Sequence, residues 1–128
     1  QLAELRAEEV ALIGGEAYLH PGFLDVVRAL RDNGLRVTMT TGARGIDEAL
    51  ARSIAEAGLY SVSVSIDGLE ETHDLMRAAK GSFRSATAAL GHLKRAGVTI
   101  TANTNWNRHV DPGVISAVGT AGALKSTR

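Results

Sequence analysis

Four short segments with glycine or polar side chains each follow a strand-like stretch of the sequence. They are Gly14-Gly15-Glu16, Thr41-Gly42, Ser65 to Gly68 and Asn103 to Asn105. In parallel α/β folds, ligands bind beyond the carboxyl ends of the strands, so these segments should meet at one edge of a sheet. Adjacent glycines expose main-chain groups that a Cβ would screen, and a carboxylate can hold an amine or a hydroxyl. The pattern predicts a polar ligand site, with an ordinary turn and a solvated or helix-capping Glu16 as the alternative.

The elements that must position these segments follow from the spacing of apolar residues. Alternation or short apolar runs predict strands over 10–13, 37–41, 60–67 and 98–104. Helical spacing predicts helices over 22–33, 46–57 and 82–96, each followed by glycine, with Ser82 as an N-cap. Strands separated by helices form right-handed βαβ units and a parallel sheet. We therefore expect an α/β domain of about four parallel βα units over 1–108, with a poorly specified tail over 109–128.

The predicted sheet has one apolar and one polar face. The apolar face carries Val37, Met39, Val62, Val64, Ile66, Val98, Ile100 and Ala102. The other face carries Thr38, Thr40, Ser63, Ser65, Asp67, Thr99, Thr101 and Asn103. A half-polar face is costly to bury beneath a helix, so it suits the lumen of an open barrel that holds a polar ligand. The alternative is that small Thr and Ser side chains fill interior layers of a barrel.

Composition excludes several classes of function. The chain has 128 residues, 14 Lys+Arg against 14 Asp+Glu, and 4% aromatic residues, so neither charge nor stacking favours a nucleic-acid partner or an anionic membrane. It has no cysteine, which excludes disulfides, thiolate nucleophiles and an iron–sulfur cluster ligated within this chain. The four histidines lack the spacing of a metal site. No long apolar run or signal peptide is present, so we expect a soluble, cytoplasmic protein, and Gln1 in first place suggests a fragment.

Four motifs in this order and spacing resemble the radical S-adenosylmethionine (radical SAM) superfamily. They are Gly14 to Phe23, Val64 to Gly68, Thr72 to Arg77 with Gly81-Ser-Phe83 following, and Thr101 to Arg108. The resemblance is greatest to the branch that modifies peptides and cofactors and often carries a C-terminal auxiliary-cluster domain. It implies a partial (β/α)6 barrel, of which this chain is similar to the second to fifth βα units.

The resemblance also implies ligands for each motif. Gly14, Gly15 and Glu16 would bind the methionyl amino group of SAM. Ser65 and Asp67 would lie beside the ribose and carboxylate, and Arg77 of the His73-Asp74-x-x-Arg77 stretch would pair with the SAM carboxylate. Asn103 and Asn105 would lie near the nucleoside or the substrate. The alternative for Asp67 and Arg77 is a surface salt bridge with each other, worth about 0–1 kcal/mol.

One family feature is missing from the sequence. The Cys-x3-Cys-x2-Cys loop, whose thiolates hold a [4Fe–4S] cluster, has no counterpart here, and we expect it upstream of residues 1–8, which resemble the end of a first helix. The leading hypothesis is the central part of an enzyme that generates a 5′-deoxyadenosyl radical to modify a peptide or small molecule. The alternative is a degenerate homologue that only binds. A half-barrel for a phosphate or aldehyde substrate would need a strand lysine, whereas Lys80, Lys94 and Lys125 lie outside the predicted strands.

Overall fold

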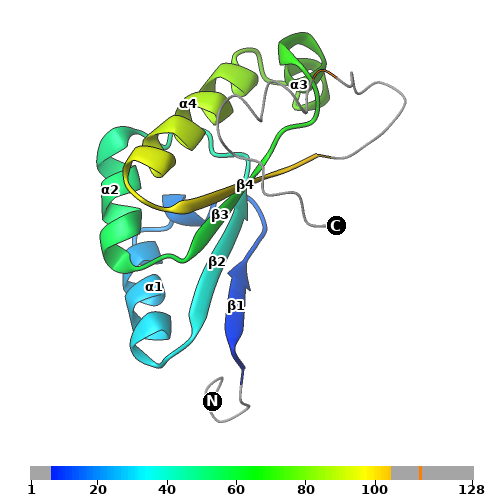
Figure 1. Ribbon diagram of the computed structural model, residues 1–128. Coiled ribbons are helices and arrows are strands. Elements are labelled where there is room, and N and C mark those ends of the chain that lie inside the picture. Colours follow the sequence, from blue (N-terminus) through cyan, green and yellow to red (C-terminus); the bar gives the residue numbers. More distant parts are fainter. Residues whose placement is uncertain (1–6, 105–112, 114–128) are drawn as a thin grey trace.

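Within residues 7–104 the chain forms a four-stranded parallel sheet connected by helices (Figure 1). The computed structural model describes residues 7–104 and Gly113. The strands are β1 (Glu9–Leu12), β2 (Arg36–Thr41), β3 (Ser61–Ser65) and β4 (Thr99–Asn103), in the order β1-β2-β3-β4. The helical elements are the 3-10 turn η1 (Ala17–Leu19), α1 (Phe23–Asp32), α2 (Glu48–Ala57), α3 (Glu70–Met76) and α4 (Ser82–Arg95). The expected α/β class and the four parallel strands are confirmed, whereas the tail over 109–128 lies outside the described residues apart from Gly113.

Local sequence signals account for both ends of α2. Asp47 caps α2 by accepting the N–H of Leu50 at 2.8 Å, and the helix ends at Gly58, whose φ is +86°. The prediction that Ser82 is the N-cap of α4 was wrong, because Gly81 takes that position with φ +81° and Ser82 begins the helix. The seven-residue helix α3 was not predicted at all. The sequence of α3 has no apolar stripe at helical spacing that would predict a helix, because its buried residue is His73 and its Leu75 is 81% exposed.

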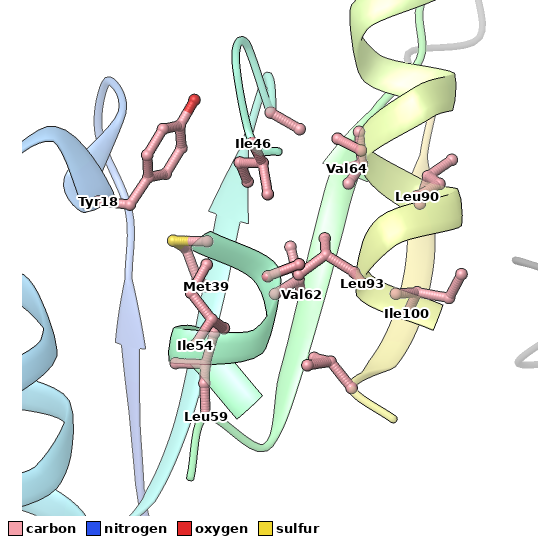
Figure 2. Close-up of a cluster of buried hydrophobic side chains, with 14 of the residues drawn as sticks. Tyr18, Met39, Ile46, Ile54, Leu59, Val62, Val64, Leu90, Leu93 and Ile100 are labelled. Atoms are coloured by element: carbon pink, nitrogen blue, oxygen red, sulfur yellow. The ribbon is translucent and has the colours of Figure 1, made fainter. Parts of the chain in front are cut away.

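The apolar face of the sheet packs against helices on one side. Figure 1 shows α1, α2 and α4 together on that side, and Figure 2 shows side chains of β2, β3 and β4 directed toward those of α2 and α4. Met39, Val62 and Ile54 are at most 1% exposed, as are Leu90 and Leu93. Burying one such side chain contributes about 1.5–3 kcal/mol. This apolar cluster fixes the sheet, and with it the positions of the strand ends.

The polar face has no helix over it among the described elements (Figure 1). Its strand residues Thr38, Thr40, Ser63, Ser65 and Thr101 are half-buried, while Thr99 and Asn103 are exposed. The prediction of one covered apolar face and one open polar face is therefore confirmed for these residues, whereas Asp67, which was expected on the open face, is only 5% exposed. Within them no helix is both long and apolar enough to cross a bilayer.

The open edges of the sheet lead to a first prediction, about self-association. In the described part of the chain β1 pairs only with β2, and β4 pairs only with β3, so each presents an edge that another strand can join. We expect concentration-dependent association in light scattering, and we expect Ile13→Lys, directly after β1, to reduce it. Leu19→Lys is the control, because Leu19 is 71% exposed against 73% for Ile13 but lies in η1. A monodisperse monomer at high concentration would contradict this prediction.

Candidate functional site

The predicted site residues gather at the carboxyl ends of the parallel strands. Ser65 and Asn103 are register partners on β3 and β4, and the N–H of Ile66 donates to the Asn103 carbonyl at 2.9 Å. Gly14 and Gly15 follow β1, and Asp67 follows β3. Asn105 lies outside the described residues. The structure therefore brings the other predicted residues to one end of the sheet.

The turn after β1 requires its glycines for conformational reasons. Gly14 has φ +91° and Gly15 has φ +59°, in the left-handed region that L side chains rarely adopt. A Cβ built at either position would have no heavy atom within 4 Å, so the space above this backbone is open. The turn thus has both properties that the sequence suggested: a backbone that demands glycine, and main-chain groups that a ligand can approach.

Glu16 is half-buried and is held by the loop that follows β2. The hydroxyl of Thr41 donates to Glu16 Oε2, and the N–H of Arg44 reaches Oε1 at 3.5 Å. The Glu16 side chain makes no capping hydrogen bond to η1. Glu16 thus stands at the N-cap position of η1, but its carboxylate is held by the loop after β2 rather than by the helix.

Asp67 and Arg77 form an ion pair at the end of β3. Arg77 Nη2 lies 2.5 Å from Asp67 Oδ2, and the Asp67 side chain is 8% exposed against 34% for Arg77. The pairing that was the alternative to ligand binding is thus present, but its carboxylate is buried rather than on the surface. A guanidinium has five N–H donors, so Arg77 keeps donors beyond the one in this contact.

His73 joins the end of β3 to the start of α4. Its Nδ1 accepts the N–H of Asp67 at 3.0 Å, and its Nε2 lies 3.1 Å from Ser82 Oγ. Because a backbone N–H can only donate, Nδ1 carries no proton, and Nε2–H donates to the serine hydroxyl. Burial and the nearby Arg77 charge lower the pKa of His73, which favours this neutral form.

Asp74 caps helix α4 across the loop that follows α3. Its Oδ2 accepts the N–H of Gly81 at 2.6 Å, and its Oδ1 accepts the N–H of Phe83 at 2.8 Å. These backbone donors, Phe83 first and then Gly81, lower the pKa of the Asp74 carboxyl. Together His73, Asp74 and Arg77 fix the chain between β3 and α4, a role the sequence did not reveal beyond placing them in one motif.

Thr41 is the site residue whose contribution the sequence left unspecified. It was placed at a strand end without a role, yet it bonds Glu16 and is 3% exposed. A signal was present: in the alternation of 37–41, Thr41 takes the same parity as Val37 and Met39 on the apolar face. A hydroxyl on the buried face needs a partner.

No cluster of metal-ligating side chains is found within residues 7–104. A hollow of about 1130 Å³ lies beside α3, and among its lining residues are Leu69, Leu75 and Lys80. From the polar network described above, its lining includes Asp74 and Gly81 but neither His73 nor Arg77. The predicted ligand site is therefore the open rim of the sheet rather than this hollow.

Comparison with known proteins places the chain in a family. The family model described as the radical SAM superfamily matches residues 1–107. The chain belongs to the radical SAM superfamily. The resemblance of its four motifs is thereby confirmed, together with an open sheet consistent with part of the radical SAM barrel.

Several curated relatives of this radical SAM chain are named as synthases or a cyclase. It is 30% identical over 99 residues to Fe-coproporphyrin III synthase of Methanosarcina barkeri, covering 77% of this chain and 25% of that protein. It is 31% identical over 109 residues to an AdoMet-dependent heme synthase of the same organism, covering 84% and 31%. It is 28% identical over 129 residues to the PqqA peptide cyclase of Rhizobium meliloti, covering 100% and 34%. The chain thus spans about a quarter to a third of the length of these relatives.

The two cofactors of radical SAM enzymes differ in how they fit these residues. The open backbone at Gly14 and Gly15, the fixed carboxylate of Glu16 and the uncovered polar face suit a ligand with an amino group and hydroxyls. The sequence has no cysteine, so it offers none of the thiolates that hold a [4Fe–4S] cluster. The residues of this chain fit SAM and do not fit the cluster.

Proposed function

We propose that the carboxyl-end rim of this sheet binds S-adenosylmethionine, as the core of a radical SAM enzyme that modifies a peptide or a small molecule. One observation carries this proposal: the polar face, which no helix of the described residues covers, ends at a rim where the Gly14-Gly15 backbone is open and the Glu16 carboxylate is already oriented. Orientation before binding reduces the entropic cost of association.

The predicted residues within the described part of the chain each have a role that their surroundings support. The main chain of Gly14 and Gly15 and the carboxylate of Glu16 would take the methionyl ammonium group. Ser65 and Asn103, side by side at the strand ends, would offer a hydroxyl and an amide to the nucleoside. Arg77 would fork onto the ligand carboxylate with the donors that Asp67 does not use. Asn105 keeps the role that the sequence gave it, near the nucleoside or the substrate.

SAM supplies radical chemistry when it binds beside a reduced [4Fe–4S] cluster. We propose that the cluster ligands of this enzyme lie outside these 128 residues, because the chain contains no cysteine. The part played by residues 7–104 is to bind and orient SAM on the uncovered polar face.

A second prediction tests the turn after β1 by ligand binding. We expect Gly15→Ala to weaken binding of S-adenosylhomocysteine by about tenfold or more, because the added methyl group enters the open space that the ligand would fill. Chemical shifts of the isotope-labelled chain, followed by nuclear magnetic resonance during titration, measure this change.

Gly34→Ala is the matched control for backbone strain. Gly34 has φ +77° and, like Gly15, open space around its Cβ position, but it precedes β2 at the opposite end of the sheet. Both variants force an L side chain into a left-handed conformation, at about 1–2 kcal/mol each. Equal affinities for Gly15→Ala and Gly34→Ala would show that the turn after β1 is not a ligand site.

Binding without catalysis is the second candidate, and the absence of cysteine favours it. The two candidates differ in the full-length protein. An enzyme would carry the visible absorption of an iron–sulfur cluster and form 5′-deoxyadenosine, whereas a binding module would bind SAM and do neither.

A further inference from the structure

The loop that follows β2 contacts the Glu16 carboxylate at several points. Thr41 donates its hydroxyl proton to Oε2, and the N–H of Arg44 approaches Oε1 at 3.5 Å. A Cβ at Gly42 would lie 3.0 Å from Oε1, so the backbone of this loop packs directly against the carboxylate. Residues Thr41–Arg44 therefore hold the Glu16 carboxylate together, and this segment is called the receptor loop below.

The direction of the Thr41 hydroxyl proton follows from its second hydrogen bond. The N–H of Ala43 donates to Thr41 Oγ1 at 2.9 Å, and this oxygen is thereby an acceptor on one side. A carboxylate can only accept, so the hydroxyl proton must point to Glu16. Thr41 is 3% exposed, so bulk water does not compete with Glu16 for its hydroxyl proton.

The receptor loop is held in a conformation that costs free energy. Ala43 is fully buried and has φ +59°, which is uncommon for a residue other than glycine. Such strain persists only where the surroundings hold it, and it is concentrated at functional sites. Here Tyr18 supplies one restraint, because its hydroxyl donates to the Arg44 carbonyl at 2.6 Å, and Figure 2 shows its ring directed toward this loop. Burial and the Glu16 charge raise the pKa of Tyr18 well above its usual value, so the hydroxyl remains a donor.

We propose that Thr41 is a positioning residue, which acts through Glu16 to select ligands with a cationic amino group. This inference rests on the proposed function of the rim. The hydroxyl of Thr41 donates to Oε2 and holds the carboxylate, and the Tyr18 side chain also interacts with Glu16. The hydrogen bond to Oε1 is the long one from the Arg44 N–H at 3.5 Å, so Oε1 keeps acceptor capacity for an ammonium group. A carboxylate held in this way binds an ammonium without first losing side-chain freedom.

The test compares two ligands that differ at the amino acid. S-adenosylhomocysteine carries the amino group and the carboxylate, whereas 5′-methylthioadenosine shares the adenosine and the thioether but lacks both. We expect the wild-type chain to prefer S-adenosylhomocysteine, and we expect Thr41→Val to reduce that preference by about tenfold with little change for 5′-methylthioadenosine. Thr41→Ser keeps the hydroxyl and should restore the preference.

Two further variants separate positioning through Glu16 from general loosening of the loop. Gly42→Ala crowds Oε1 while leaving the Thr41 hydroxyl in place, and it should lower the same preference. Glu16→Gln should lower it as well, and the double variant Thr41→Val/Glu16→Gln should be no worse than Glu16→Gln alone, because both changes remove one interaction.

The outcomes distinguish this inference from the proposed function. A wild-type chain that binds S-adenosylhomocysteine no better than 5′-methylthioadenosine would overturn the assignment of Glu16, and with it this inference. A wild-type preference that survives Thr41→Val, or an equal loss for both ligands, would overturn only the positioning role of Thr41.

Discussion

Replacing Arg77 by methionine is expected to lower the free energy of unfolding by about 2–3 kcal/mol, because it leaves the buried Asp67 carboxylate without its ion-pair partner. Methionine retains much of the apolar stem, so the loss reports the charge rather than the packing. Urea denaturation at neutral pH measures the change.

Arg28→Met is the matched control for the Arg77 variant. Arg28 pairs with Asp25 at 3.0 Å on the outside of α1, where the two side chains are 45% and 81% exposed. Exposed pairs of this kind contribute about 0–1 kcal/mol. In an Asp67→Asn background the buried charge is gone, and Arg77→Met should cost less. If Arg77→Met is as mild as Arg28→Met, Asp67 does not depend on its partner.

The same position separates the structural from the ligand-binding role of Arg77. Arg77→Lys keeps a positive charge near Asp67 and should retain most of the stability. It removes the planar fork that suits a carboxylate, so binding of S-adenosylhomocysteine should weaken if Arg77 contacts the ligand. Unchanged affinity in Arg77→Lys would assign Arg77 to the ion pair alone.

The sheet was predictable because its signals are local. Alternation of residues such as Val62, Ser63 and Val64 fixes which side chains share a face, and a glycine after each predicted helix marks where that helix ends. The alternation of strands and helices along the chain then makes parallel pairing of the strands the simplest arrangement. The placement of the strand ends, and therefore the location of the candidate site, followed from the same reasoning.

The hydrogen bonds within the site were not predictable because they join residues that are distant in the sequence. Glu16 meets Thr41 across 25 positions, and nothing local to either residue specifies the other. Ser82 was expected to cap α4 because serine is a common N-cap, but Asp74 supplies two acceptors to the same helix end. With the backbone donors already satisfied, the Ser82 hydroxyl is available to His73.

The buried imidazole of His73 gives the second large expected effect. His73→Phe keeps a ring beside Phe83, which now meets the imidazole edge-on at a centroid distance of 5.9 Å. It removes the acceptor for the Asp67 N–H and the donor to Ser82. Loss of a buried hydrogen-bond partner costs about 1–3 kcal/mol, so we expect a decrease of about 2–3 kcal/mol in the free energy of unfolding.

The pH dependence of stability identifies the imidazole as the cause. The pKa of His73 is lowered in the folded chain by burial and by Arg77, the negative charges of Asp67 and Asp74 opposing this. On acidification the unfolded state therefore binds a proton first, near pH 6.5, and the folded state is destabilised until the pH passes its own lower pKa. The stabilisation that His73 contributes is complete above about pH 6.5 and is lost below it.

Urea denaturation between pH 7.5 and 5 should show this loss in the wild-type chain. It should persist in His92→Gln, which changes a histidine in the last turn of α4 whose ring lies 2.9 Å from Arg95 Nη2. In His73→Phe the curve should lie lower at neutral pH and be flatter over this interval, because the titrating group is gone. Asp74, whose pKa is also lowered in the fold, acts only at lower pH, near and below its usual value of 3.8. Parallel curves for the wild type and His73→Phe would mean that the proton binds elsewhere, and that the link from β3 to α4 does not depend on a neutral imidazole.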